Sequence, residues 1–395
     1  MILAWITGLL RLRGKTLVTA ACGVAAAVAL LALLGLHVSH SAATMSARAV
    51  ALVAPDWQVQ LQGTSDAEPA VAAIQEVADK APLQLVDYAD IKSLTAQTGG
   101  TTQTTGAGKA IGLDPGYFTL FPRQFRLLAG SLDGPLLAQQ TAANLHAAPG
   151  DRVTIDRLGA PAVPVTVAGI VEMPSADQFF QVVGATGRAA PTAPPDNVIL
   201  LPAARWRDLF ETQLDAMPQT AARQIHASID HGRLAADPVA AYVDATGLAN
   251  NLSARLAGEG VIADNLAARL DGVRLDALFA KVLFLFLGLP GAVVALVLTM
   301  LIVSSAAQRR RQEIALLQMR GASPARGLLL VGIEALITGG LGGAVGLILA
   351  WLVAALLALP AGLDMFSWYV AAAAAGLIAA LLIFLIPAAA AMRRS

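Results

Sequence analysis

The stretch SSAAQRRRQEIALLQMRGASPARG, residues 304–327, determines the layout of this chain, because it places five arginines between two long apolar segments. An arginine at the centre of a bilayer costs about 2.5–3.5 kcal/mol on the insertion scale, so Arg309, Arg310 and Arg311 together would cost roughly 8–10 kcal/mol. The stretch must therefore lie in the cytoplasm or another aqueous phase. The apolar segments on its two sides are then separate membrane helices.

Working outward from this stretch, we find four segments long enough to cross the hydrocarbon layer as a helix, which takes about 20 residues. They are residues 17–36, 279–305, 327–359 and 367–391. The chain is 56% hydrophobic and only 14% charged, which is far more apolar than an average soluble domain. The sequence predicts an α-helical membrane protein with four transmembrane helices and a large α+β extracytoplasmic domain inserted between helices 1 and 2.

The basic residues near the helix ends set the orientation. They lie in residues 11–15, in 309–326 and in 393–394, whereas the remaining short loop, 360–366, has no Lys or Arg. The positive-inside rule places all three basic segments in the cytoplasm. We therefore expect cytoplasmic N- and C-termini, and we expect the inserted domain on the outer side.

These observations give a full set of expected boundaries. The segments are a cytoplasmic amphipathic N-terminus 1–16, helix 1 at 17–36, the extracytoplasmic core domain 37–260, a stalk helix 261–278, helix 2 at 279–305, a cytoplasmic coupling loop 306–326, helix 3 at 327–359, an external loop 360–366, helix 4 at 367–391 and a cytoplasmic tail 392–395. A cleaved signal peptide is the alternative for the N-terminus, but its apolar region would be about 7–15 residues, shorter than 17–36.

The first part of the inserted domain is predicted to be a small α+β unit. Residues 56–62 alternate apolar and polar side chains, which indicates a strand, residues 67–79 have helical spacing, and residues 83–88 suggest another strand. Residues 98–108, TGGTTQTTGAG, are rich in Gly and Thr without periodicity, so we expect a loop there.

The rest of the domain is predicted to contain a hairpin followed by helices. Residues 131–172 suggest a short strand, a helix ending near His146 and two strands joined by a turn. We expect residues 187–197 to form a Pro-rich loop and residues 203–256 to be mainly helical. Residues 261–278 have apolar side chains at three- and four-residue intervals, which predicts one stalk helix continuous with helix 2.

The charge and the motifs exclude several function classes. The net charge is +0, which gives no support to nucleic-acid binding, and the single cysteine, Cys22, excludes an intrachain disulfide. TTGAGKA resembles a phosphate-binding loop, but Gln103 stands at its first glycine position and Ala110 follows Lys109. We find no catalytic motif and no metal-ligand cluster, so we expect neither an enzyme nor a metal site, and no cofactor bound by this chain.

Helix 3 carries one acid and a glycine pattern. Glu334 has two interpretations: it is part of an ion path, or it is a structural or coupling acid near the cytoplasmic boundary. The sequence has no second intramembrane acid with which to form a relay, and this favours the structural or coupling role. Gly339 and Gly343, and likewise Gly342 and Gly346, are four residues apart, a spacing that lets another helix approach closely. That contact could lie within the chain or in a dimer.

The charged stretch itself also has two interpretations. Ile314, Leu317 and Gln318 share one helix face, and Gly321 is suited to end the helix. An ordinary positive-inside loop would explain this pattern, and so would a helix that docks on a cytoplasmic partner.

A family resemblance favours docking. RRRQEIALLQMRGASPARGLLLVGIEALITGGLGGAVGLILA, residues 309–350, resembles the signature of the FtsX-like permease family, which includes ABC transporter permeases of the MacB and LolC/LolE type. Residues 134–155, GPLLAQQTAANLHAAPGDRVTI, are similar to the core domain of MacB-like permeases. The similarity is strong over 277–395, moderate over 131–172 and weak elsewhere in the domain.

The resemblance implies a function. It implies a permease in a bacterial inner membrane that works by mechanotransmission on a lipid-linked, lipoprotein, peptide or drug substrate. MacB carries its nucleotide-binding domain on the same chain and this sequence has none, so a separate cytoplasmic ABC ATPase would bind ATP and Mg²⁺. The residues implied to contact that ATPase share one loop: Arg309, Arg310, Arg311, Glu313, Ile314, Leu317, Arg320 and Gly321.

Further partners follow from the same resemblance: a second permease copy, identical or paralogous, membrane lipids, and an extracytoplasmic adaptor or delivery protein. Two other functions stay open at this point. One is an FtsX-like regulator that activates a cell-wall hydrolase without transport, and the other is a membrane-anchored enzyme, which would need a catalytic constellation that the sequence lacks.

Overall fold

The computed structural model describes residues 2–62, 66–180, 183, 195–256, 258–305, 324–359 and 363–392. The chain divides into two compact units. A helical unit contains residues 1–45 and 275–395, and an α/β unit contains residues 46–274. Each unit is described by itself below.

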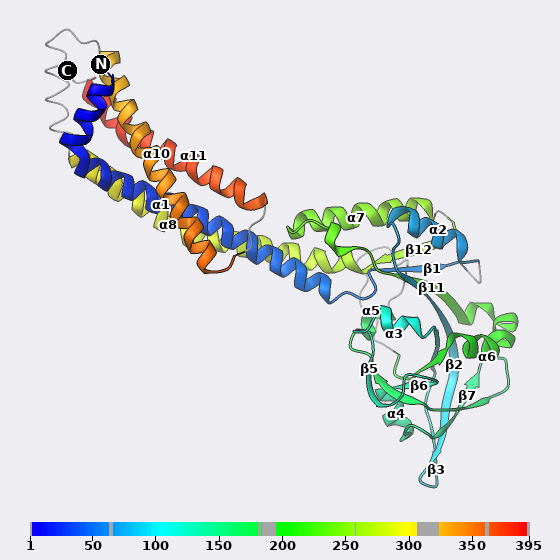
Figure 1. Ribbon diagram of the computed structural model, residues 1–395. Helices are drawn as coiled ribbons and strands as arrows, with labels where there is room; N and C mark the ends of the chain where they lie inside the picture. Colours follow the sequence, from blue (N-terminus) through cyan, green and yellow to red (C-terminus); the bar gives the residue numbers. More distant parts are fainter. Residues whose placement is uncertain are drawn as a thin grey trace. The chain divides into compact units, whose positions relative to one another are not determined.

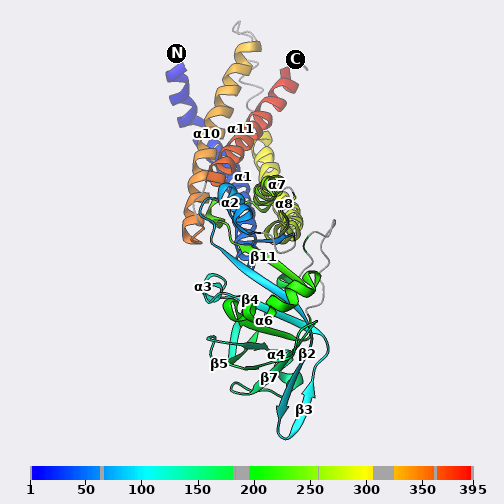
Figure 2. The same ribbon diagram turned by 90° about the vertical axis from the view of Figure 1, so that its right-hand side faces the viewer.

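The helical unit is built from long apolar helices (Figure 2). The helices are α1 (Ile2–Ala51), α8 (Asn265–Ser305), α10 (Pro324–Leu356) and α11 (Leu363–Met392). Each contains a stretch long and apolar enough to cross a membrane, four such helices in the described residues. The four predicted membrane helices are thus present, and α1 and α8 also extend into the α/β unit.

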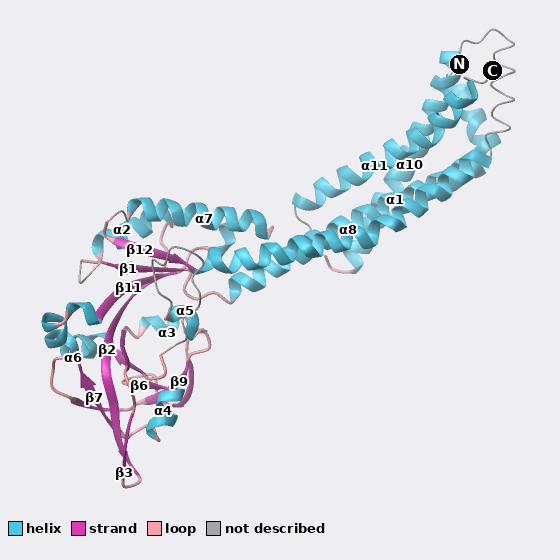
Figure 3. Ribbon diagram, turned by 180° about the vertical axis from the view of Figure 1, so that it is seen from behind, coloured by secondary structure: helices cyan, strands magenta, loops and turns pink. Residues whose placement is uncertain are grey.

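The α/β unit contains one mixed sheet of twelve strands in its described residues (Figures 1 and 3). The order is β12-β1-β11-β2-β4-β10-β6-β9-β5, with β3 and β7 also paired to β2, and β8 paired to β7. The strands are β1 (Trp57–Leu61), β2 (Leu83–Thr98), β3 (Thr101–Thr104), β4 (Gly108–Leu113), β5 (Arg126–Gly130), β6 (Leu136–Ala138), β7 (Arg152–Arg157), β8 (Val163–Thr166), β9 (Gly169–Glu172), β10 (Val198–Pro202), β11 (Ala221–Ala227) and β12 (Gly260–Asp264).

Six helices and two 3₁₀ turns connect the strands. They are α2 (Glu68–Val77), α3 (Gly116–Leu120), α4 (Gln139–Leu145), α5 (Ala176–Phe179), α6 (Ala203–Ala216), η1 (Pro218–Thr220), η2 (His231–Arg233) and α7 (Pro238–Arg255). Apolar residues of α2 and α7 form one core with β1 and β11, and α6 packs on β4 and β10 in a second core around Trp206 and Phe210. The indole of Trp206 donates a hydrogen bond of 3.1 Å to the carbonyl of Ala110.

The strand β2 joins these parts of the sheet. It is 16 residues long, and its first half pairs with β11 and β4, whereas its second half pairs with β7 and β3. The Gly/Thr-rich residues 98–108, predicted as a loop, instead contain the β2–β3 hairpin. Gly99 and Gly100 occupy its turn with φ of +57° and +80°, which matches the two-residue turns that suit a hairpin.

Two further predictions were wrong in part. Residues 203–256 were expected to be mainly helical, but β11 lies among them and pairs with both β1 and β2. Its last four residues, 224–227, are all buried and do alternate polar and apolar, but a pattern of four residues is too short to stand out among the helical segments around it. The stalk helix was predicted to begin at residue 261, but residues 260–264 form β12, and α8 begins at Asn265.

Candidate functional site

The residues predicted to contact an ATPase lie outside the described residues. This applies to Arg309, Arg310, Arg311, Glu313, Ile314, Leu317, Arg320 and Gly321. The other predicted site residues lie on α10 and are described.

Three of the four predicted packing glycines lie at helix contacts within the chain. A Cβ at Gly342 would stand 2.8 Å from the carbonyl oxygen of Ala21, and a Cβ at Gly346 would stand 2.6 Å from that of Ala25, so both glycines pack on the backbone of α1. A Cβ at Gly339 would meet Ala380 of α11 at 2.9 Å. Gly343 has nothing within 4 Å of such an atom, so it faces away from these contacts.

The other helices approach α1 in the same way. A Cβ at Gly288 of α8 would meet Leu34 at 2.6 Å, and a Cβ at Gly376 of α11 would meet Val28 at 2.3 Å. Gly23 of α1 faces the hydroxyl of Thr299. The sequence analysis did not identify these three glycines, because they are not part of a four-residue repeat. Together with Gly342 and Gly346, these three glycines bring α8, α10 and α11 into close contact with α1.

Glu334 lies inside the helical unit. It is 3% exposed, and its backbone carbonyl accepts a hydrogen bond of 2.8 Å from the hydroxyl of Thr338. Its neighbours Val331 and Ala335 belong to an apolar cluster with Phe384 of α11. The role of Glu334 as a structural or coupling acid stays a prediction.

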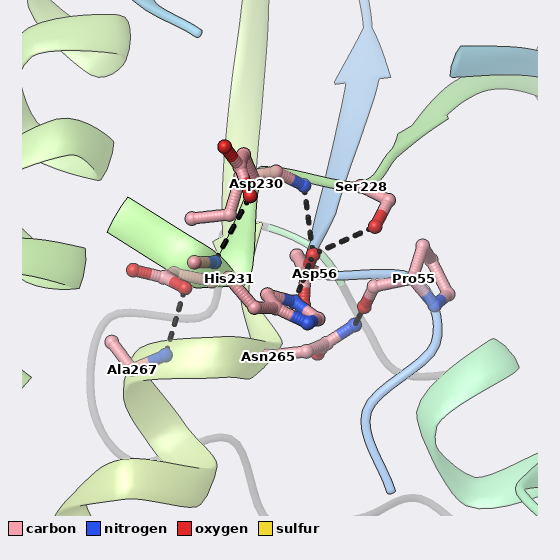
Figure 4. Close-up of polar contacts among 10 residues, drawn as sticks. Pro55, Asp56, Ser228, Asp230, His231, Asn265 and Ala267 are labelled. Atoms are coloured by element: carbon pink, nitrogen blue, oxygen red, sulfur yellow. Dashed lines mark hydrogen bonds and ion pairs between the residues drawn. The ribbon is translucent and has the colours of Figure 1, made fainter. Parts of the chain in front are cut away.

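A polar cluster lies in the α/β unit at the point where the link from α1 meets the first residues of α8. We call the cluster the polar junction and define it as Asp56, Ser228, His231, Asp264 and Asn265. Figure 4 shows Asp56 between His231 on one side and Ser228 on the other. These residues come from the α1–β1 link, the end of β11, η2, the end of β12 and the start of α8.

The carboxylate of Asp56 is the centre of the polar junction. It is 1% exposed and accepts hydrogen bonds from the Ser228 hydroxyl at 3.0 Å, from the Ile229 backbone N–H at 2.8 Å and from His231 Nε2 at 2.8 and 2.9 Å. A buried carboxylate is tolerated only when it is paired and hydrogen-bonded in this way. Asp56 therefore holds the segment after β11 against the α1–β1 link.

The backbone of the same link holds the start of α8. The carbonyl of Asp56 accepts from the N–H groups of Asn265 at 2.9 Å and Leu266 at 3.3 Å. The Asn265 side chain donates to the carbonyl of Pro55 at 3.0 Å, as Figure 4 shows. Two of the N–H groups that a helix start leaves unpaired are thus bonded to the link.

Asp264 caps α8. One oxygen of its side chain, Oδ1, accepts from the Ala267 N–H at 2.9 Å, the usual bond of a helix N-cap. The other oxygen, Oδ2, is buried and has no hydrogen-bond partner among the described residues. Burial raises the pKa of Asp264 to about 7, against the opposing effect of the backbone hydrogen bonds from Ala267 and Leu266, and the charge of Asp56 adds to the increase.

His231 is shifted in the direction that favours its charged form. Its hydrogen bond to Asp56 raises its pKa above the ordinary value, partial burial opposes this, and the charges of Asp56 and Asp230 add to the increase. Two groups of the polar junction, His231 and Asp264, therefore favour their protonated forms in the fold.

Sequence analysis did not identify the polar junction. Asp56 is separated by 172 residues from Ser228 and by 175 from His231, and Asn265 is separated by 210 from Pro55. No motif or period links residues at such distances. The only local signal is Asp56 directly before the alternating strand Trp57–Leu61, a position where an acid is common for other reasons.

A second buried polar group surrounds His226 on β11. Its Nδ1 lies 2.8 Å from the Tyr117 hydroxyl, and its Nε2 lies 3.0 Å from Gln224 Oε1 and 3.4 Å from the Tyr88 hydroxyl. Complete burial lowers the pKa of His226 to about 3, so the ring is neutral at physiological pH. Its hydrogen bonds and the surrounding aromatic rings give it a role in packing.

No three His, Cys, Asp or Glu side chains in the described part of the chain are close enough to hold a metal ion. The polar junction ties the ends of two long helices to one sheet, and the glycine contacts let four apolar helices approach closely. These features define a class: a membrane protein with four membrane-spanning helices and a large α/β insertion after the first.

Comparison with protein families identifies the family. The family model described as MacB-like periplasmic core domain matches residues 16–245, more than half of the chain, and the one described as FtsX-like permease C-terminal matches residues 284–395. The chain belongs to the FtsX-like permeases with a MacB-like core domain, a family of ABC transporter permeases. No match to the chain was found among curated proteins.

Proposed function

We propose that this chain is a permease subunit that converts ATP hydrolysis by a separate cytoplasmic ATPase into movement of its α/β unit. The observation that carries the proposal is the joint presence of a MacB-like core and an FtsX-like C-terminal region on one chain. In the described residues, α1 and α8 both run from apolar membrane segments into the α/β unit. Such continuous helices can transmit a displacement without a pore for solute.

The proposed orientation places the α/β unit outside the inner membrane of a bacterium and both termini in the cytoplasm. Its test uses the single native cysteine, Cys22, which is first replaced by serine. A new cysteine is then introduced by Thr102→Cys in the exposed β2–β3 hairpin or by Ser395→Cys at the C-terminus. A membrane-impermeant maleimide should label spheroplasts carrying Cys at 102 and spare those carrying it at 395; the reverse pattern would refute the orientation.

Residues 309–321 are proposed to dock on the ATPase. The chain would be tagged and purified from its own membranes together with any bound subunit that hydrolyses ATP. The Mg²⁺-dependent ATPase rate of that subunit would then be compared with and without the permease. Arg311→Ala and Glu313→Ala should abolish stimulation while membrane insertion stays intact. Gln308→Ala, in the same loop but outside the resemblance, should behave as the parent. Unchanged stimulation in both test variants would refute the docking role.

The proposed cargo is a lipid-linked molecule, a lipoprotein, a peptide or a drug, taken from the outer face. The core-domain match supports transport over regulation, because it covers the part of the chain that would meet such a cargo. The competing function is the activation of a cell-wall hydrolase. Neighbouring genes distinguish the two: a periplasmic adaptor or lipoprotein gene favours export, and a peptidoglycan hydrolase gene favours regulation.

A transporter core is proposed to need two permease chains, identical or paralogous. Co-expression of two differently tagged copies tests this. Recovery of both tags after one-tag purification supports a homodimer, and recovery of a single tag together with a paralogue supports a heterodimer. Recovery of one tag with no second permease would refute the two-chain core.

A further inference from the structure

The polar junction joins three segments that are far apart in the sequence. The carbonyls of residues 55–56 accept hydrogen bonds from the Asn265 side chain and from the backbone N–H groups of residues 265–266, and the Asp56 side chain accepts from residues 228–231. Apolar contacts reinforce this connection, since Val50 of α1 and Leu266 and Leu270 of α8 belong to one buried cluster. The N-terminal turn of α8 is therefore held by a small number of bonds around one buried and one half-buried carboxyl group.

We propose that the polar junction is a proton-sensitive latch, closed in mildly acidic medium and loosened in mildly alkaline medium, which sets how firmly the start of α8 is held to the link from α1. The geometry supports this through one feature above all: Asp264 is half-buried, its buried Oδ2 has no hydrogen-bond partner among the described residues, and it pairs in the sheet with Trp57, the residue after the buried Asp56.

The net charge of the latch in its two protonation forms shows in which direction pH changes its stability. In the acidic form His231 carries one positive charge, Asp56 one negative charge and Asp264 none, so the latch is neutral. In the alkaline form His231 is neutral and both carboxyl groups are ionised, so the latch carries two negative charges. Asp56 is buried and Asp264 is half-buried, so water screens the two like charges poorly and they repel. Both proton losses therefore weaken the same connection.

His231 and Asp264 each make the fold less stable as the pH rises. His231 has a raised pKa in the fold, so its contribution is present below its unfolded pKa and is lost as the pH rises through the folded value. Asp264 also has a raised pKa, to about 7, so the fold gives up stability as the pH rises from the unfolded value toward 7. The two losses add over the neutral range.

The capping bond of Asp264 acts in the opposite direction. An ionised carboxylate accepts the Ala267 N–H more strongly and interacts favourably with the helix N-terminus. The raised pKa of Asp264 indicates that burial outweighs these two effects. Loss of the proton is therefore expected to be relieved by movement of the cap toward water.

Other charged groups near the latch do not reverse this result. Asp230, next to η2, faces His231 and favours its proton. Further along α8, Asp271 pairs with Arg274 at 2.5 Å, and the Arg274 guanidinium also lies 4.2 Å from the ring centre of Tyr242 on α7. Among β1, β11 and β12, the one Lys or Arg is Arg223 of β11, and it pairs with Asp87 at 2.7 Å.

If the proposed orientation is correct, the latch would sense the pH outside the cell; only this consequence rests on the proposed function. The latch itself requires neither ATPase nor substrate. A failure of the experiment below would thus leave the permease proposal intact, and a failure to find an ATPase would leave the latch intact.

The test is amide hydrogen exchange of the full chain in lipid nanodiscs at about pH 6 and about pH 8.5. Exchange rates are corrected for their intrinsic pH dependence, and a peptide covering residues 260–270 is compared with one from β10. We expect protection of residues 265–267 to fall about tenfold at the higher pH relative to β10, because a shift of one pKa unit corresponds to a tenfold change in the opening equilibrium. Asp264→Asn and His231→Gln should each remove part of the fall, and the double variant should remove it all.

Asp271→Asn is the matched control, because it neutralises an acid of α8 that lies outside the latch. It should show the same fall as the parent chain. The proposal is overturned if the parent chain shows no selective loss of protection, or if the double variant keeps the full loss. Should a variant fail to assemble, the comparison of the parent chain at the two pH values still decides between a latch and a pH-insensitive connection.

Discussion

The two units of this protein differ in the side chains that pack their interiors. The largest fully buried residues of the α/β unit are aromatic, with Trp57, Trp206 and Phe210 among them. The helical unit is packed at α1 through glycines, such as Gly342 and Gly346, against backbone carbonyls. In water, burial of large apolar side chains drives folding. In lipid that force is absent between helices, so close backbone approach takes its place.

The strongest test of this comparison is to empty the aromatic core. Trp206→Ala removes a buried indole and its hydrogen bond to Ala110, and we expect a loss of about 3–5 kcal/mol in the stability of the α/β unit. Calorimetry of the detergent-solubilised chain, with limited proteolysis to identify the unit that unfolds, would measure it. Arg205→Ala, an exposed neighbour on α6, should change little; equal effects of the two variants would contradict the assigned core.

The next test removes the buried carboxylate of the polar junction. Asp56→Ala leaves the Ser228 hydroxyl, the Ile229 N–H and the His231 ring without their acceptor, and we expect a loss of about 3–5 kcal/mol, at the lower end of that range because His231 is partly exposed. Asp56→Asn keeps an acceptor and should lose less. Thermal unfolding of both variants measures the difference, and a fully stable Asp56→Ala chain would refute the importance of the junction.

A smaller effect is expected in the helical unit, where the comparison predicts that adding one methyl group does harm. Gly346→Ala would place its Cβ 2.6 Å from the Ala25 carbonyl oxygen, so α10 and α1 must separate, at about 1–3 kcal/mol. Gly343→Ala, on the open side of the same helix, should be neutral or slightly stabilising because alanine favours helix. Residual monodisperse protein after heating in detergent, read by size-exclusion chromatography, separates the two.

The smallest expected effect is the pH dependence from His231. Because its pKa is raised by Asp56, the stability it contributes is present below its ordinary value and declines as the pH rises through the folded value. His231→Gln should therefore flatten the dependence of the melting temperature between about pH 6 and pH 8.5. A variant with the same slope as the parent chain would show that His231 does not contribute.

The helical unit was largely predictable from sequence because each apolar segment is a local signal. The segments 17–36 and 367–391 both lie inside observed helices. The start of α8 was less predictable: residues 261–264 have apolar spacing that fits a helix, yet they pair with β1 as an edge strand. Strand pairing depends on a partner 200 residues away, which no local pattern contains.

The α/β unit was predictable where a local pattern is clear, whether or not one face meets water: β1 alternates although Gln58, on its polar face, is buried. The strand at residues 57–61 and the helix near residue 74 show the expected alternation and spacing. β11 alternates only over residues 224–227, and segments with helical spacing lie on both sides of it, so the short pattern was missed. The polar junction forms only after this sheet has assembled, which explains why Asp56 and Asp264 gave no sequence signal.

The pairing of β1 with β12 has a consequence for how such a chain can be built. The register places Trp57 opposite Asp264, so the first and last strands of the α/β unit begin and end about 5 Å apart, the spacing of neighbouring strands. The chain thus enters and leaves the sheet at neighbouring positions, and the adjoining turns of both long helices belong to the core of the unit through Val50, Leu266 and Leu270. The domain is, in this sense, a module that includes the last turn of α1 and the first turns of α8.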